Sequence, residues 1–370
     1  MIRSISISDY FQQYSHGLLL DVRSPGEYEH AHIPGARSIP LFTNDERKVV
    51  GTAYKQESRE KAIKIGLKYF GPKMVKMVEE VEKLKAESIK LKAEGKGQEE
   101  VDFPIVVHCW RGGMRSAGVA WLLDLYGFEV YTIKGGYKSF RHWCLQQLDA
   151  SHAMHIIGGY TGSGKTELLH ALASRGEYII DLEGLASHKG SAFGNINMPP
   201  QPSQEMFENK LAMALAAAKG RTIWMEDESQ RIGDVNMPFG FFKKMRSAPL
   251  YFLDIPFEER LDYIVKDYGK GDIEKLVNAI IRIQKRLGGL EAKNAIQCLL
   301  EQDIRGCFAI LLRYYDKWYL KGLDRTSHRC GRQVDKSFAA DHQCYGQCHG
   351  IIKPSRCGAG IKKPAEAGSD

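Results

Sequence analysis

One cysteine stands in a sequence context that could make it a nucleophile. Cys109 follows the apolar run 105–108 and precedes the loop Trp110-Arg111-Gly112-Gly113-Met114-Arg115, after which the apolar residues take helical spacing. A loop between a strand and a helix can direct backbone N–H groups and the positive helix end at the sulfur. Arg111 and Arg115 add positive charge, and all these effects favour the thiolate. An isolated cysteine would more often be a small core residue, but this context predicts that Cys109, Arg111 and Arg115 are catalytic.

A second motif has the pattern of a phosphate-binding loop. The run 159–166 reads G-Y-T-G-S-G-K-T and lies between an apolar run and a helical one, the context that G-x-x-x-x-G-K-T requires. Backbone N–H groups of such a loop wrap a phosphate, and the lysine supplies a charge. The predicted phosphate-binding residues are Gly159, Gly162, Ser163, Gly164, Lys165 and Thr166.

A magnesium site is one possible extension of the phosphate loop. The Thr166 hydroxyl could ligate Mg²⁺, with Glu226 or Asp227 as an acidic partner after the apolar run 222–225. The alternative is a charged turn that merely follows a strand. Nothing in the sequence identifies a nucleotide, so the motif predicts only that a phosphate-bearing anion binds.

Two successive α/β patterns can position these loops. The first has buried-strand patterns at 18–22, 105–108 and 129–133. Helices are expected over 116–126 and 137–148, and a highly charged helix over 73–97. The second has strand patterns at 154–157, 178–180, 222–225 and 250–253, followed by a mostly helical stretch over 258–321. Strands that alternate with helices predict parallel sheets. We expect domains at 1–150 and 151–326, then a poorly ordered tail at 327–370.

The first domain resembles the rhodanese family. The resemblance rests on the Cys109 loop, on Asp21-Val22-Arg23-Ser24-Pro25-Gly26-Glu27-Tyr28 and on His32-Ile33-Pro34-Gly35-Ala36. It implies a fold in which the loop cysteine carries a persulfide. Five residues separate Cys109 from Arg115, whereas a typical sulfurtransferase loop has four, and five is the spacing of cysteine-dependent phosphatases. Loop length therefore does not decide between three activities: sulfur transfer, phosphate-ester chemistry and the handling of a larger chalcogen-phosphate.

The combination of both domains resembles the tRNA 2-selenouridine synthases. The segments that carry the resemblance are 50–56, 109–116, 133–137, 181–194, 224–233 and 254–260. The fold class implied is α/β, with an N-terminal rhodanese-like domain and a C-terminal P-loop NTPase-like domain that has a helical extension. The activity implied is transfer of a geranyl group from geranyl diphosphate to wobble 2-thiouridine, then replacement of S-geranyl by selenium from selenophosphate. Cys109 matches the cysteine that forms the S-selanylcysteine intermediate.

Two other functions remain open at this stage. One is a rhodanese-fold sulfurtransferase or Cys-dependent phosphatase with a nucleotide-binding regulatory domain. The other is a non-catalytic module that binds tRNA or nucleotides, which the presence of both Cys109 and Lys165 disfavours.

Composition is compatible with an RNA partner. The chain has 370 residues, 52 Lys and Arg, 45 Asp and Glu, and a net charge of +7, which permits an anionic partner without requiring one. Basic residues near aromatic ones suggest tRNA contacts by Arg282, Lys285, Arg286 and Arg313, although a solvated basic helix explains them equally well.

The cysteines and the apolar runs bear on compartment and metals. No run reaches the roughly 18 apolar residues of a membrane span, and no secretory signal is recognised, so we expect a reducing cytoplasm with free thiols. No firm metal site is predicted, because the tail residues match no strong zinc spacing. Those residues are His328, Cys330, His342, Cys344, Cys348, His349 and Cys357.

Overall fold

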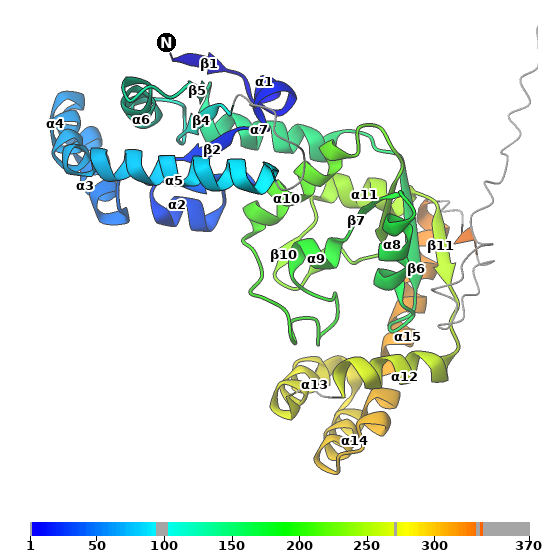
Figure 1. The fold of residues 1–370 in the computed structure, drawn as a ribbon. Helices are drawn as coiled ribbons and strands as arrows, with labels where there is room; N and C mark the ends of the chain where they lie inside the picture. The colour runs from blue at the N-terminus through cyan, green and yellow to red at the C-terminus, as the bar shows by residue number, and fades with distance from the viewer. Residues whose placement is uncertain (1, 94–102, 270–271, 331–333, 336–370) are drawn as a thin grey trace, which may run out of the picture.

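The computed structural model describes residues 2–93, 103–269, 272–330 and 334–335, and it shows two α/β units joined through helices (Figure 1). The first unit contains a parallel sheet with strand order β1-β5-β4-β2-β3. Its strands are β1 (Arg3–Ile5), β2 (Leu18–Asp21), β3 (Arg37–Ser38), β4 (Ile105–His108) and β5 (Val130–Ile133). Its helices are α1 (Ile7–Asp9), η1 (Tyr10–Tyr14), α2 (Pro25–His30), α3 (Asn44–Gln56), α4 (Arg59–Phe70), η2 (Gly71–Lys73), α5 (Met74–Ala93), α6 (Met114–Leu125) and α7 (Gly136–Asp149).

The second unit contains a parallel sheet with strand order β12-β11-β6-β8-β7 and a small antiparallel pair, β9 and β10. Its strands are β6 (Met154–Gly159), β7 (Tyr178–Ile180), β8 (Ile223–Glu226), β9 (Arg231–Ile232), β10 (Val235–Asn236), β11 (Leu250–Leu253) and β12 (Val334–Asp335). Its helices are α8 (Lys165–Ser174), α9 (Leu182–Ala186), α10 (Gln204–Ala217), α11 (Phe239–Ser247), α12 (Phe257–Tyr268), α13 (Ile273–Leu287), α14 (Gly289–Leu300) and α15 (Ile304–Cys330).

Both sheets form because their central strands are apolar on both faces. Every residue of β2 and β4 is buried, as expected for parallel strands covered by helices on each side. The charged helix predicted over 73–97 is present as α5, and it buries Met77, Val78 and Val81 against the first sheet. The predicted fold class is confirmed: parallel sheets in both units and a helical extension, α12 to α15 (Figure 1).

The two units share one hydrophobic core. Phe140 and Leu148 of α7 belong to the same cluster of buried side chains as Phe207 and Leu211 of α10 and Phe241 of α11. Figure 1 shows α7 and α10 lying together between the sheets. The expected domain boundary near residue 150 falls in the short connection between α7 and β6.

The expected tail at 327–370 lies mostly outside the described residues. Within the described part, α15 continues to Cys330, and β12 pairs in parallel with β11, with Val334 opposite Leu250. Helical order therefore extends beyond the expected start of the tail. Among the described residues no helix is both long and apolar enough to cross a membrane.

Candidate active site

The Cys109 loop is fixed by close backbone contacts with the first turn of α7. The Tyr137 N–H donates to the Cys109 carbonyl at 2.8 Å, and the Lys138 N–H donates to the Trp110 carbonyl at 2.9 Å. A Cβ on Gly136, which has φ +56°, would lie 2.3 Å from the Cys109 carbonyl oxygen. One on Gly112, at φ +66°, would lie 2.6 Å from a backbone carbonyl of β5. Only glycine fits at these two positions.

The loop favours the thiolate form of Cys109. Burial alone would raise the pKa of the thiol, but the hydroxyl and N–H of Ser116, the charge of Arg115 and the N–H of Arg111 together lower it below its usual value. The Ser116 hydroxyl oxygen lies 3.3 Å from Sγ. Ser116 is in the first turn of α6, so the helix places N–H groups and its positive end at the sulfur, as predicted.

Cys109 differs from the other cysteines whose side chains the structure describes. Burial raises the pKa of Cys144 and of Cys307 to about 12, and it also raises the pKa of Cys298. Cys109 is only 3% exposed, yet its pKa shifts in the opposite direction. Polar groups directed at its sulfur, rather than exposure to water, therefore favour the thiolate of Cys109 and make it the candidate nucleophile among these four cysteines.

The two arginines of the loop have different positions. Arg111 is exposed on the loop surface. Arg115 forms an ion pair with Glu27, with Nη1 2.8 Å from Oε2, and the pair lowers the pKa of that carboxyl to about 2 despite its partial burial. Glu27 therefore holds Arg115 where its charge lowers the pKa of Cys109. The sequence pattern does not identify Glu27 as this partner.

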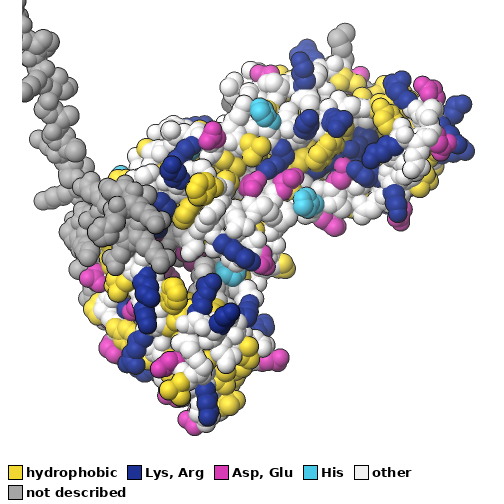
Figure 2. Space-filling view, turned by 180° about the vertical axis from the view of Figure 1, so that it is seen from behind, with side chains coloured by type: hydrophobic (Ala, Val, Ile, Leu, Met, Phe, Trp, Pro, Cys, Tyr) yellow, Lys and Arg dark blue, Asp and Glu magenta, His cyan; other side chains and the backbone are white. Residues whose placement is uncertain are grey.

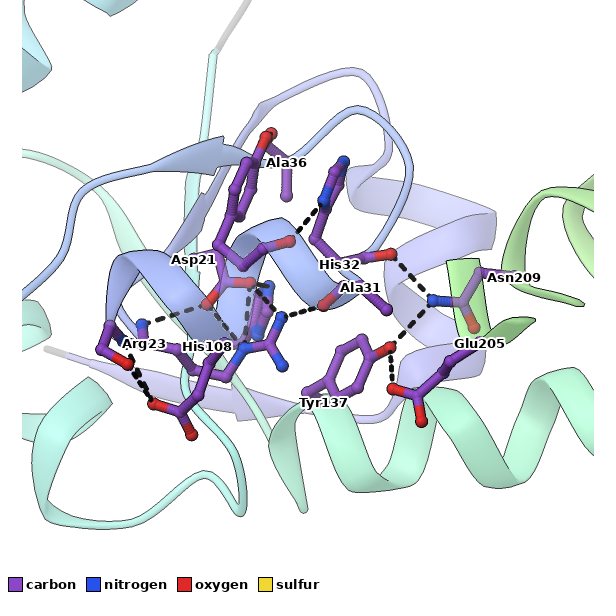
Figure 3. A network of polar contacts seen from close by, with 12 residues as sticks. Asp21, Arg23, Ala31, His32, Ala36, His108, Tyr137, Glu205 and Asn209 are labelled. Atoms are coloured by element: carbon purple, nitrogen blue, oxygen red, sulfur yellow. Dashed lines mark hydrogen bonds and ion pairs between the residues drawn. The ribbon is translucent and has the colours of Figure 1, made fainter. Parts of the chain in front are cut away.

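The Asp-Val-Arg segment contributes to a network of polar contacts that reaches Tyr137 (Figure 3). Arg23 is 1% exposed, pairs with Asp21 at 2.6 Å and donates to the Ala31 carbonyl at 2.7 Å. Its guanidinium carbon lies 3.9 Å from the centre of the Tyr137 ring. A buried arginine that is paired and stacked in this way fixes the Tyr137 ring, and the Tyr137 backbone in turn holds Cys109.

Tyr137 also connects the loop to the second unit. Its hydroxyl donates to Glu205 of α10 at 2.7 Å. The fully buried Asn209 of α10 donates to the Tyr137 hydroxyl at 2.9 Å and to the His32 carbonyl at 3.0 Å (Figure 3). Arg141 donates to the side-chain oxygen of Asn209 at 2.5 Å, so this amide is satisfied on both sides. No sequence pattern indicates Asn209, because its hydrogen bonds exist only when the two units are in contact.

The phosphate loop has the expected geometry. It follows β6 and leads into α8, and three of its glycines, Gly159, Gly162 and Gly164, have positive φ. Lys165 Nζ donates to the carbonyls of Gly159 and Tyr160 at 3.0 and 3.3 Å, so it lies over the loop. The N–H groups at the start of α8 and the lysine charge make an anion site.

The predicted magnesium partners are not gathered at one point. Asp227 forms an ion pair with Arg246 at 2.5 Å, and Glu226 accepts a hydrogen bond from the Glu183 N–H at 2.9 Å. Thr166 instead donates to the Glu183 side chain at 3.3 Å. Burial raises the pKa of Glu226 well above its ordinary value, and burial beside Glu183 raises that of Glu228 to about 8.

Asp227 and Glu226 thus have protein partners, and a magnesium role for Thr166, Glu226 and Asp227 stays a prediction. Within the described residues no group of three or more His, Cys, Asp and Glu is placed to hold a metal ion.

A cavity of about 1220 Å³ opens over the phosphate loop. Its polar lining includes the loop, Lys165 and Glu183, together with other charged side chains such as Lys189, Lys243, Arg246 and Asp267. Large apolar and aromatic side chains from α11, α12, α15 and the segment before α10 also line it. They are Met198, Phe239, Phe242, Tyr263, Ile264, Tyr268, Tyr315, Trp318 and Tyr319. All lining residues come from the second unit, so this site is separate from the Cys109 loop.

Comparison with known proteins identifies both units. Residues 152–343 match the family model of the tRNA 2-selenouridine synthase AAA domain, and residues 8–142 match that of the rhodanese-like domain. The first match covers more than half of the chain. The chain belongs to the tRNA 2-selenouridine synthase family.

Curated members of the tRNA 2-selenouridine synthase family align with most of the chain. The tRNA 2-selenouridine synthase of Marinobacter nauticus is 33% identical and covers 84% of this chain and 90% of its own. That of Hydrogenovibrio crunogenus is 36% identical over 73% of this chain and 76% of its own. That of Pseudomonas putida strain W619 is 33% identical over 84% and 90%. The family resemblance inferred from the sequence motifs is confirmed.

The four basic residues suggested as tRNA contacts lie on two helices of this synthase-family chain. Arg282 and Arg286 of α13 line a second cavity. Lys285 lies on the same helix but does not line that cavity, and Arg313 of α15 lies 5.7 Å from the Phe257 ring centre. The structure therefore separates two cavity arginines from two other basic residues.

Proposed function

We propose that this chain is a tRNA-modifying transferase. It converts wobble 2-thiouridine to 2-selenouridine through S-geranyl-2-thiouridine, with geranyl diphosphate and selenophosphate as donors. Membership of the tRNA 2-selenouridine synthase family supports the overall reaction. The observation that carries the proposal is the presence of two different sites in one chain: a cysteine loop that lowers a thiol pKa, and a phosphate loop beside an aromatic cavity.

The phosphate-loop cavity suits a diphosphate with a hydrocarbon chain. Lys165 and the loop N–H groups would hold the diphosphate, and the hydrocarbon would lie against side chains such as Phe242, Ile264 and Tyr268. The thiouridine sulfur then attacks the first carbon of the geranyl group. A C–S bond forms, the C–O bond breaks, and the diphosphate leaves with the electron pair. Positive charge at the oxygen stabilises that leaving group.

The Cys109 loop suits the selenium step. Alkylation removes the negative charge from sulfur, so that it can leave the pyrimidine C2 as geranyl thiol. A C–Se bond forms as that C–S bond breaks. The selenium of selenophosphate attacks C2 directly, and water then cleaves the P–Se bond, so that phosphate leaves and no oxidant is needed. Cys109, to which the family resemblance assigns the S-selanylcysteine, would position the selenium for this attack, and its lowered pKa favours the thiolate at that point.

Nucleoside analysis of modified tRNA tests both steps. Purified enzyme is incubated with thiouridine-containing tRNA, geranyl diphosphate and selenophosphate, with and without Mg²⁺. The nucleosides are then separated by chromatography and identified by mass spectrometry. We expect Cys109→Ala to accumulate the geranylated nucleoside without the selenated one, and Lys165→Ala to lose geranylation. Cys298→Ala, which changes a half-buried cysteine outside both sites, should behave as wild type.

Two results would contradict the proposal. Full selenation by Cys109→Ala would remove the carrier role. Wild-type enzyme that leaves tRNA unchanged but forms thiocyanate from thiosulfate and cyanide, or releases phosphate from aryl phosphates, would instead support a sulfurtransferase or phosphatase.

A further inference from the structure

A second cavity adjoins the phosphate-loop cavity in the part of the chain that the structure describes. Its volume is about 1050 Å³, and it is separate from the site assigned to the diphosphate donor. Its walls come from α13, α15, the turn between β9 and β10, and the segment that precedes α10. The two cavities share the wall residues Gly190, Ser191, Met198, Ser229 and Tyr315. A ligand in one cavity therefore lies next to a ligand in the other.

The second cavity has the charge needed to bind a phosphate. Arg282 and Arg286 are four residues apart on α13, so they share one helix face, and both line the cavity. Both are exposed, and neither forms an ion pair with an acidic side chain among the described residues. Arg231 also lines the cavity but pairs with Asp234 at 3.4 Å. Two guanidinium groups thus remain for an anionic ligand.

The other side chains suit a nucleobase. Tyr314 of α15 is half-buried and lies in the wall beside Tyr315, with ring centres 5.2 Å apart. His188 lines the cavity and is 8% exposed. Its Nδ1 is buried beside Gly194, so Nε2 is the nitrogen that can face a ligand. Burial lowers the pKa of His188, which favours a neutral ring whose Nε2 can donate or accept one hydrogen bond. An aromatic face and a neutral polar edge are the features by which proteins hold an unstacked RNA base.

Figure 2 shows the molecule from behind, and on this face of the lower lobe, which contains the helical extension, Lys and Arg side chains are interspersed with hydrophobic and some acidic ones. A surface of this kind fits the backbone of a single-stranded RNA loop, because phosphates contact the cations and bases stack on the aromatic rings.

We propose that this second cavity binds the unstacked nucleotide of tRNA whose base is presented to the phosphate-loop cavity. Arg282 and Arg286 hold its phosphates, Tyr314 stacks on the base, and His188 bonds to the base edge. The shared wall at Gly190 and Ser191 is then where the sulfur of the base meets the carbon of the diphosphate donor. This assignment rests on the proposed function and adds the position at which the RNA is held.

Binding of an anticodon stem–loop RNA tests the assignment apart from catalysis. The probe is a fluorescent stem–loop with 2-thiouridine at the wobble position, titrated with the full-length protein at several salt concentrations. We expect Arg282→Ala/Arg286→Ala to weaken RNA binding by about tenfold or more and to reduce the salt dependence by about two counterions. Tyr314→Leu should weaken binding by about tenfold with unchanged salt dependence, because stacking rather than charge is lost.

A matched control removes the same charge elsewhere on the helical extension. Lys275 of α13 and Lys293 of α14 are exposed and line neither cavity. Lys275→Ala/Lys293→Ala should bind RNA within about twofold of wild type apart from a small general salt effect. Affinity for geranyl diphosphate, measured by calorimetry, should be unchanged in every variant.

The outcomes separate this inference from the proposed function. If Arg282→Ala/Arg286→Ala binds the stem–loop as wild type does, or if the lysine control weakens binding equally, the cavity does not hold the nucleotide, while the proposed reaction can still stand. If wild-type enzyme binds the stem–loop through this cavity but forms neither modified nucleoside, the proposed reaction fails and the binding site stands.

Discussion

The Ser116 hydroxyl is a specific test of how the Cys109 loop activates its thiol. It lies 3.3 Å from Sγ and is the largest of the influences that lower the pKa of Cys109. Ser116 is 1% exposed, and alanine fits the same space. Ser116→Ala removes this contact together with the hydrogen bond that the hydroxyl donates to the Gly113 carbonyl at 3.1 Å. The N–H groups of Ser116 and Arg111 and the charge of Arg115 remain. The variant should therefore raise the pKa of Cys109 without unfolding the loop.

The size of the change follows from the energy of one hydrogen bond. A hydrogen bond to a charged group contributes about 1.5–3 kcal/mol. Sulfur is a weak acceptor at a long distance, so the lower end, about 1.5 kcal/mol, applies. Since one pKa unit corresponds to about 1.4 kcal/mol, the pKa of Cys109 should rise by about one unit. At a pH below the wild-type pKa of Cys109, the thiolate fraction should therefore fall about tenfold, and the rate of the selenium step should fall with it.

Ultraviolet absorbance of the thiolate measures this pKa directly. The titration of Cys109→Ala is subtracted from that of each variant, which isolates the Cys109 signal from those of the other cysteines. Ser88→Ala is the control, because the Ser88 hydroxyl donates to the Leu84 carbonyl within α5, away from the loop. If Ser116→Ala titrates as the control does, the side-chain contact does not stabilise the thiolate, and activation must come from the helix and backbone alone.

Three further outcomes follow from the described contacts. Asn209→Leu should lower the free energy of unfolding in urea by about 2 kcal/mol, because it leaves the Tyr137 hydroxyl and the His32 carbonyl without their buried donor. Gly136→Ala should abolish selenation, because its Cβ would lie 2.3 Å from the Cys109 carbonyl oxygen. Gly127→Ala is the control: this glycine has φ +103° with open space around it, so the variant should lose only about 1 kcal/mol of stability and keep its activity. Glu27 has a folded pKa of about 2 against an ordinary 4.5, so its contribution is complete above pH 4.5 and is lost as pH falls toward 2; Glu27→Gln should flatten that part of the urea stability profile.

Each of these results has an opposite that would refute it. Unchanged stability of Asn209→Leu would mean that water replaces the amide. Selenation by Gly136→Ala at the wild-type rate would show that the loop can move by the required distance. Equal pH dependence of wild type and Glu27→Gln would show that the pair with Arg115 does not survive in solution.

The sequence predicted the parts whose chemistry is local. Each of the two loops is a contiguous run of residues. Glycine with cysteine, or glycine with lysine, at these fixed spacings is typical of anion-binding loops, so the sequence alone predicts functional roles for Cys109 and Lys165. The buried strands were also predictable, because apolar runs such as Leu18-Leu19-Leu20 suit only a covered parallel sheet.

Features that depend on distant segments were not predictable. Glu27 reaches Arg115 across 88 residues, and Asn209 reaches His32 across 177. Acidic residues after β8 suggested a metal site, but a sequence cannot show that Asp227 is paired with Arg246 while Glu183 approaches Thr166. Arg282 and Arg286 could be told from Lys285 only once the helix was placed against its neighbours.

The core that both units share has a consequence for the fragments of the enzyme. Phe140 and Leu148 on one side pack with Phe207 and Phe241 on the other, around the buried Asn209 amide. Each half expressed alone would expose these rings to water and should aggregate. If the chain is instead cut once by a protease between Asp149 and Met154, the two halves should stay bound to each other and elute together in gel filtration. They should separate only in denaturant.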